Sequence, residues 1–332
     1  MSSANTAVMA SYTDAIADLP EEAFLGSLLF FSICQADVNL VNANRDLTAA
    51  GLSTEGLRKM LRPVDAFRKA SRRIEHTFAP DDGIRSTVMV RPVGEDGEQA
   101  YRHVVLERAI VKQGQKRRVF YDKVAELTFT RGQKVNGNYV NHGVECRRSV
   151  IADLKDFEDR WIAEQLATYE DHYDHLLHYM DSHAVRTFVR EYIYRLSGTC
   201  VKESGGLYFV KQEHADEIRR LAAWVRSVGS EFHTLPLLNL GDQRAMILEA
   251  FEEETIVEVE RAMAEVSRIL SEPDRKIEEK TFDAYADRAA ALAAKVQEYH
   301  NMLGTRADRA AAEIDMYGQQ VLALSSRIKV RA

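Results

Sequence analysis

The stretch HVVLERAIVKQGQKRRVFYDKV, residues 103–124, decides what kind of fold this chain adopts. Two runs rich in β-branched and aromatic residues flank Gln113-Gly114-Gln115, a pattern typical of two antiparallel strands joined by a tight turn. Further β-rich runs, separated by Asp-Gly pairs, occupy the rest of residues 80–150. We therefore expect a small antiparallel β insert of about five strands in this segment.

Helical patterning surrounds the β insert on both sides. We expect residues 1–19 to be a flexible N-terminus and residues 20–79 to form a helical hairpin. Pro20-Glu21-Glu22 suits a first helical turn, and the apolar run 24–34 would continue that helix to about residue 50. Residues 151–240 are expected to combine helices with a small α+β module. The chain has 6 prolines, and none lies between Pro92 and Pro236, which favours long helices.

The C-terminal residues 241–332 carry the most regular pattern in the chain. From Phe282 to Leu303, apolar residues recur at alternating spacings of three and four, which is typical of coiled-coil packing. Interruptions at Pro273 and Gly304 predict three antiparallel helices. The predicted association residues of this seam are Phe282, Tyr285, Leu292, Val296, Tyr299 and Leu303. The seam must be buried within the chain or in an oligomer, and the sequence leaves both open.

These patterns together predict an α+β fold that is mainly α. Its expected order is a helical N-terminal part, the antiparallel β insert, the α+β module and the antiparallel coiled-coil helices. The composition, 45% apolar and 29% charged residues, excludes a disordered chain, a collagen and a disulfide-dense miniprotein.

Charge and cysteine usage bound the class of protein further. The formal net charge is −7, yet residues 80–148 carry 13 basic against 9 acidic side chains. Cys34, Cys146 and Cys200 are widely spaced, which argues against structural disulfides and favours a reducing cytoplasm. The apolar run 24–34 is shorter than the ~20 residues that a bilayer-spanning helix needs, so no membrane association is expected.

The basic β insert is the first candidate for function. Cations interleaved with aromatic rings are typical of single-stranded nucleic-acid platforms, because phosphates attract cations and bases stack on flat rings. An expected basic helix face within residues 58–73 supports a DNA or RNA partner. The alternative is a hairpin whose cations merely prevent edge-to-edge pairing. The candidate contact residues are Lys112, Lys116, Arg117, Arg118, Phe120, Tyr121 and Lys123.

A histidine cluster is the second candidate. In YEDHYDHLLHYMDSH, residues 169–183, a helical arrangement places Asp171, His175 and His178 within roughly 60° of one another. One carboxylate and two imidazoles are the beginning of a Zn or Mn site, and so of a metal-dependent hydrolase. The alternative is a solvated polar face, since no HExxH motif is present. No other cofactor is expected.

The absence of glycine-rich motifs excludes several enzyme classes. The chain lacks GxxxxGK[ST], GxGxxG and GxSxG, so a P-loop ATPase, a Rossmann oxidoreductase and an α/β-hydrolase are excluded.

A second pattern lies in the C-terminal half of the chain. It consists, in order, of SGGLYFV (residues 204–210), an expected helix to Trp224, FHTLPL (residues 232–237) and Gln243-Arg244. Over roughly residues 180–260 this pattern resembles uncharacterised helical proteins of actinobacterial phages and plasmids. The resemblance implies a mobile-element setting and carries no known activity.

The sequence thus predicts a non-catalytic interaction protein of a phage or mobile element. Its coiled-coil region would mediate association, with a second copy or with a host or phage protein, and its basic β insert would contact nucleic acid. Two alternatives remain open: a metal-dependent hydrolase built on the histidine cluster, and an inhibitor or adaptor that binds a host protein.

Overall fold

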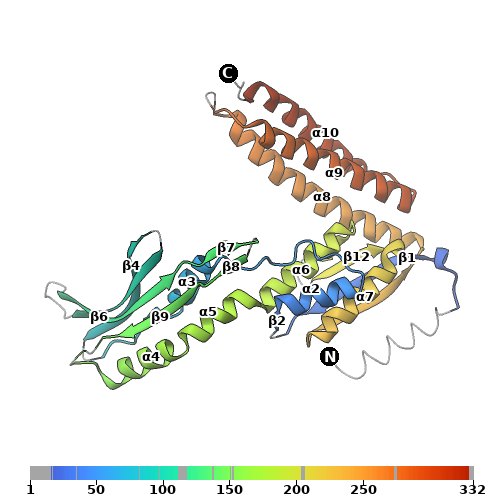
Figure 1. Cartoon of the computed structure of the whole chain (residues 1–332). Coiled ribbons are helices and arrows are strands. Elements are labelled where there is room, and N and C mark those ends of the chain that lie inside the picture. Colours follow the sequence, from blue (N-terminus) through green and yellow to red (C-terminus); the bar gives the residue numbers. More distant parts are fainter. Residues whose placement is uncertain are drawn as a thin grey trace. The chain divides into compact units, whose positions relative to one another are not determined.

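The chain folds into two compact units, shown in a computed structural model (Figure 1). Unit 1 draws on residues 1–36, 46–56 and 182–332, and unit 2 on residues 37–45 and 57–181. Among the described residues, no helix is long and apolar enough to cross a membrane. The structure describes residues 16, 18–34, 36–81, 83–96, 98–110, 118–136, 138–149, 151, 153–202, 206–272 and 275–328.

Unit 1 is built on a four-stranded antiparallel sheet in the order β11-β12-β1-β13. Strand β1 is central and pairs with β12 on one side and with β13 on the other. The strands are β1 (Phe24–Ser32), β11 (Thr199–Lys202), β12 (Leu207–Lys211) and β13 (Glu231–Leu238).

The predicted helical N-terminal part is wrong. A short 3₁₀ turn, η1 (Glu21–Ala23), directly precedes the apolar run, and that run becomes β1. Leu25 and Leu29 are buried at 3% and 0% exposure, and a spacing of four places them on one face of a strand as well as of a helix. A strand with neighbours on both sides buries a continuous apolar run, so period alone could not separate the two forms.

The second helix of the predicted hairpin is also shifted. Helix α2 (Leu40–Ala49) is followed by irregular chain, and α3 begins only at Pro63 and ends at Arg72. Arg58, expected on the helix, instead donates to the carbonyl oxygens of Tyr179 and Leu176, at 3.0 and 2.8 Å. The proline at the first helical position explains this later start.

Helices complete unit 1. Helices α6 (Ser182–Arg195) and α7 (Ala215–Ser227) meet where the Phe188 and Trp224 rings lie 5.5 Å apart. The 3₁₀ turn η2 (Gln212–His214) joins β12 to α7. The expected C-terminal helical region is present as α8 (Gly241–Leu270), α9 (Glu279–Leu303) and α10 (Asp308–Ala323), followed by η3 (Leu324–Arg327).

Unit 2 is built on a five-stranded antiparallel sheet in the order β3-β4-β5-β6-β9. The strands are β3 (His76–Thr77), β4 (Ile84–Glu95), β5 (Gln99–Ile110), β6 (Arg118–Thr130) and β9 (Gly143–Arg148). Two small pairs accompany them: β7 (Gln133–Val135) with β8 (Asn138–Val140), and β2 (Asp37–Asn39) with β10 (Tyr179–Asp181).

One face of this sheet carries the core of unit 2. Val88, Val104 and Leu106 are fully buried there, and they pack with Phe67 of α3 and Tyr173 of α5. Alternate strand residues point to the opposite face, which is only partly buried. The covering helices are α3, α4 (Asp156–Ala167) and α5 (Tyr169–His178).

Candidate nucleic-acid interface

The hairpin of β5 and β6 is the segment singled out from the sequence. Its pairing runs from Gln99 opposite Thr130 to Ile110 opposite Arg118. Lys112, Lys116 and Arg117 belong to the connection between the strands and lie outside the described residues.

The described candidate residues of β6 divide between the two faces of the sheet. Arg118 and Phe120 face the same side as the core, beyond the part that the helices cover, whereas Tyr121 and Lys123 face the open side. The rings of Phe120 and Tyr121 are 52% and 54% exposed. The structure therefore presents two aromatic rings to solvent, but on opposite faces.

The open side of the sheet adds a cation that sequence reasoning missed. The Arg91 guanidinium from β4 lies 5.2 Å from the centre of the Tyr121 ring. Lys123 is less available, since its ammonium lies 3.3 Å from Glu126, which also accepts from His103 at 3.2 Å. These two hydrogen bonds hold the pKa of Glu126 below its usual value. Only strand pairing could have linked β4 to Tyr121.

Helix α3 presents a dense group of cations among the described residues of unit 2. Its apolar residues, among them Ala66, Phe67 and Ala70, recur at three and four and pack into the core. The opposite face carries mainly basic residues. We define the α3 basic face as Arg68, Lys69 and Arg72 of α3, Arg73 directly after the helix, and Arg102 of β5, which reaches the edge of the helix at Ser71.

Within the described part of the chain, only some of these cations have a partner in an ion pair or a hydrogen bond. Arg68 lies 3.1 Å from Glu95, and Arg73 lies 2.9 Å from a ring nitrogen of His172. Among the ion pairs between described residues, none includes Lys69 or Arg72. The α3 basic face therefore keeps positive charge that no neighbouring carboxylate neutralises.

The pKa values of Arg102 and His172 reflect the positive potential at this face. The pKa of Arg102 is lowered by burial and further by Arg68 and Arg72, while its guanidinium donates to Ser71 at 2.9 Å. Burial, and then nearby cations that include Arg73 and Lys69, also lower the pKa of His172. Like charges held this close favour a bound anion.

The histidine cluster does not assemble as the predicted metal site. His175 Nε2 lies 2.5 Å from Asp37 of β2, and its ring stacks on Tyr179 at 4.8 Å. Asp171 and His178 are exposed elsewhere on α5. Among the described residues, no group of three or more His, Cys, Asp or Glu side chains is arranged to hold a metal ion.

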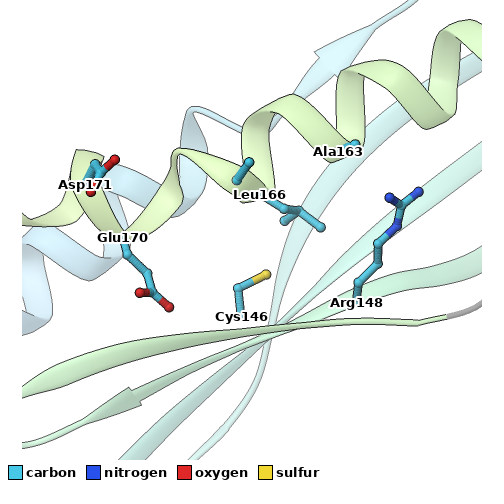
Figure 2. A pocket seen from close by; sticks show the side chains of 7 residues that line it. Cys146, Arg148, Ala163, Leu166, Glu170 and Asp171 are labelled. Carbon is cyan, nitrogen blue, oxygen red and sulfur yellow. The ribbon is translucent and has the colours of Figure 1, made fainter.

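A small cavity of about 400 Å³ lies between β9 and helices α4 and α5. Figure 2 shows Glu170 extending from α5 toward the strand that carries Cys146. Burial, and then the charge of Glu170, raise the pKa of the Cys146 thiol to about 11. The thiol is therefore protonated at neutral pH and is a poor nucleophile. Arg148, on the same rim, is paired with Asp159.

The predicted association residues lie inside unit 1. Leu292, Tyr299 and Leu303 are 5%, 0% and 1% exposed. Phe282, Tyr285 and Val296 are partly buried in the same clusters. Residues of α8, α9 and α10 form most of the first cluster, and Leu25, Phe209 and Leu237 of the sheet join them in the second, so the seam is filled by the chain itself.

Comparison with known proteins yields a family and no named relative. A family model described as a family of unknown function (DUF6744) matches residues 24–330. No curated protein matches the chain. No solved structure matches it either.

Proposed function

The chain belongs to the DUF6744 family, whose function is unknown, and on that premise we propose that unit 2 binds the phosphate backbone of a nucleic acid. The α3 basic face carries this proposal. It holds five cations, of which Lys69 and Arg72 have no partner among the described ion pairs. The pKa of Arg102 is lowered first by burial and then by Arg68 and Arg72, and a bound phosphate would offset the part that comes from these two cations.

The extent of the basic face favours a polymer over a single anion. The cations of its helical part lie within residues 68–73, a length of about 7.5 Å along the helix axis. Duplex DNA presents one negative charge per ~1.7 Å of its axis, so several phosphates would lie along such a surface. Each neutralised phosphate releases counterions, which makes the binding dependent on salt.

The exposed ring of Phe120, on the side of the sheet that α3 covers, supports a single-stranded segment as the preferred form. Unpaired bases stack on aromatic side chains irrespective of sequence. We accordingly propose a non-catalytic nucleic-acid-binding protein. Its phage or plasmid setting is part of the proposal and rests on the resemblance of residues 180–260.

The test is fluorescence anisotropy of labelled single- and double-stranded DNA and RNA across a salt series. The variant is Lys69→Ala with Arg72→Ala. The charge-matched control is Arg160→Ala with Lys280→Ala, two exposed cations that are not part of the basic face. We expect weaker binding by the first variant and a salt dependence shallower by about 2 in log–log slope, about 0.9 for each lost phosphate contact.

The control should bind like the unchanged chain. An unchanged salt slope in the Lys69→Ala, Arg72→Ala variant, or an equal loss in the control, contradicts the proposal.

A further inference from the structure

Unit 1 contains a large cleft that the proposed function does not use. It lies between α6, β11–β12, α8 and α9 and has a volume of about 1340 Å³. Sites for small ligands usually measure about 300–1,000 Å³, so this cleft has room for a nucleotide-sized molecule.

The lining of the cleft is positive although its unit is acidic. Unit 1 carries 21 Lys and Arg against 30 Asp and Glu, a formal charge of −9. The cleft is nevertheless lined by five cations and three carboxylates. A concave surface of one sign, set in a low-dielectric wall, concentrates ligands of the opposite sign.

Three of the five cations are available to a ligand. Arg190 of α6, Lys202 of β11 and Arg261 of α8 are exposed, and none takes part in an ion pair between described residues. They come from three different elements and line one space. Such an arrangement fits an anion with several oxygens, such as a chain of phosphates.

The other two cations are already neutralised. Arg288 lies 3.6 and 3.7 Å from the carboxylates of Glu258 and Glu265. Lys295 lies 3.7 Å from Glu254 and donates to the carbonyl oxygen of Gly198 at 3.2 Å. These pairs leave the three exposed cations, rather than Arg288 and Lys295, as the place where an anion binds.

Glu254, a carboxylate whose side chain is mostly buried, forms the floor of the cleft and supplies a hydrogen-bond acceptor there. One of its oxygens accepts the backbone N–H of Cys200 at 3.1 Å, whereas its Oε2 is buried with no hydrogen-bond partner among the described residues. Burial raises the pKa of this carboxyl, against the opposing effect of Lys295. Glu254 Oε2, which lies 3.7 Å from the Lys295 ammonium, is thus an acceptor that the described residues leave without a hydrogen bond, and it favours a ligand with a hydrogen-bond donor.

Two tyrosine rings, Tyr194 and Tyr208, belong to the lining of the cleft. The Tyr194 ring is 40% exposed and meets Tyr208 edge-on, with centres 6.0 Å apart. An exposed ring held in place by a second ring offers a flat surface for stacking.

Two residues beyond the end of α6, a residue that lines this cleft is strained. Ser197 adopts φ +54°, a left-handed conformation that is uncommon for residues other than glycine. Such outliers concentrate at functional sites.

We propose that this cleft binds a nucleoside triphosphate. The phosphates would lie on Arg190, Lys202 and Arg261. The base would stack on Tyr194 and direct an amino or imino group toward the Glu254 side of the floor. A purely anionic ligand, such as an acidic peptide, is disfavoured because it would meet the carboxylates of α8.

The test is isothermal titration calorimetry of the full chain with ATP, GTP, CTP and UTP, and with inorganic triphosphate as the probe for a plain anion site. We expect saturable binding of at least one nucleotide with a Kd below 1 mM, and binding of triphosphate at least about tenfold weaker, since the base contributes through stacking. Arg190→Ala with Arg261→Ala should raise the nucleotide Kd at least about tenfold.

Matched variants separate this site from general charge and folding effects. Arg219→Ala with Arg306→Ala removes two exposed cations of unit 1 outside the cleft and should leave the Kd unchanged. Tyr194→Phe should bind normally and Tyr194→Ala weakly. The proposal is overturned by any of three results: no saturation by any nucleotide at 1 mM, triphosphate binding as tightly as the nucleotides, or an equal loss in the control.

Discussion

The guanidinium of Arg108 lies 2.9 Å from Oε2 of Glu158, whose side chain is completely buried. This pair joins β5 to the first turn of α4. Arg108→Ala would leave a buried carboxylate without its cation, so we expect a loss of about 3 kcal/mol in the free energy of unfolding of unit 2. Urea unfolding followed by circular dichroism measures it. Arg85→Ala, an exposed arginine of β4, should change stability by less than about 0.5 kcal/mol; similar losses in both variants contradict the pair's role.

The same carboxylate makes stability depend on pH. Burial alone would raise the pKa of Glu158, but hydrogen bonds from Arg108, Ser86 and the Lys155 N–H outweigh it and hold the pKa below its usual value. A group with a lowered folded pKa stabilises above its unfolded value of about 4.3, and this stability is lost as the pH falls through the folded pKa.

We therefore expect the urea midpoint of unit 2 to fall as the pH drops from 5 to 3. Glu158→Gln cannot be protonated, so its midpoint should fall less steeply over the same range. Parallel pH profiles for the two proteins would show that Glu158 is not the responsible group.

Gly26 in β1 has no space for a side chain. A Cβ there would lie 2.2 Å from the carbonyl oxygen of Val210 and 2.7 Å from the Phe209 ring. Gly26→Ala must displace the central strand of unit 1, and we expect a cost above about 3 kcal/mol. Gly94→Ala, where nothing lies within 4 Å, is the control and should be nearly neutral. Thermal unfolding of both variants gives the comparison, and equal melting temperatures would contradict this packing.

The same strand shows where sequence reasoning about the fold ends. The β insert and the C-terminal helices have periods that admit one interpretation, and both are present. The run from Phe24 to Ser32 does not, because Leu25 and Leu29 suit either period. The run becomes a strand because it pairs with β12 and β13, which lie about 180 and 200 residues later in the chain. Pairing over such separations leaves no local signal.

The candidate sites divide in the same way. The basic exposed side of α3 follows from helical spacing, although its extension by Arg102 depends on the register of β5 against the helix. The proximity of His175 to Asp37 depends on the pairing of β10 with β2, and the spacing within α5 could not show it. The cleft of unit 1 unites residues of α6, β11, α8 and α9, so no single motif marks it.

Phe120 tests the preference of unit 2 for single strands. Phe120→Ala removes a stacking surface, and we expect about a tenfold loss of affinity for single-stranded DNA or RNA. The salt slope should not change, because a neutral ring releases no counterions. Phe120→Tyr keeps the ring and should bind normally in fluorescence anisotropy. An equal loss for duplex DNA, or a shallower salt slope, would show that the ring does not act by stacking.

Tyr299 tests whether the apolar seam of α9 packs within its own chain or binds a partner. Its ring stacks on Phe251 with centres 3.9 Å apart, and its hydroxyl accepts from Thr199 at 2.7 Å and donates to the Ser197 carbonyl at 2.8 Å. Tyr299→Phe leaves both groups short of a partner, so we expect a loss of about 1–2 kcal/mol in the unfolding free energy of unit 1.

Leu292→Ala should cost about 2–4 kcal/mol because it opens a cavity between the helices, whereas Leu322→Ala, at a side chain 69% exposed, should cost little. Light scattering after size-exclusion chromatography should give the same molar mass for all variants and the unchanged chain, because the seam residues are buried against their own chain. If Leu292→Ala instead lowers the molar mass and leaves the unfolding free energy unchanged, the seam is an interface between molecules.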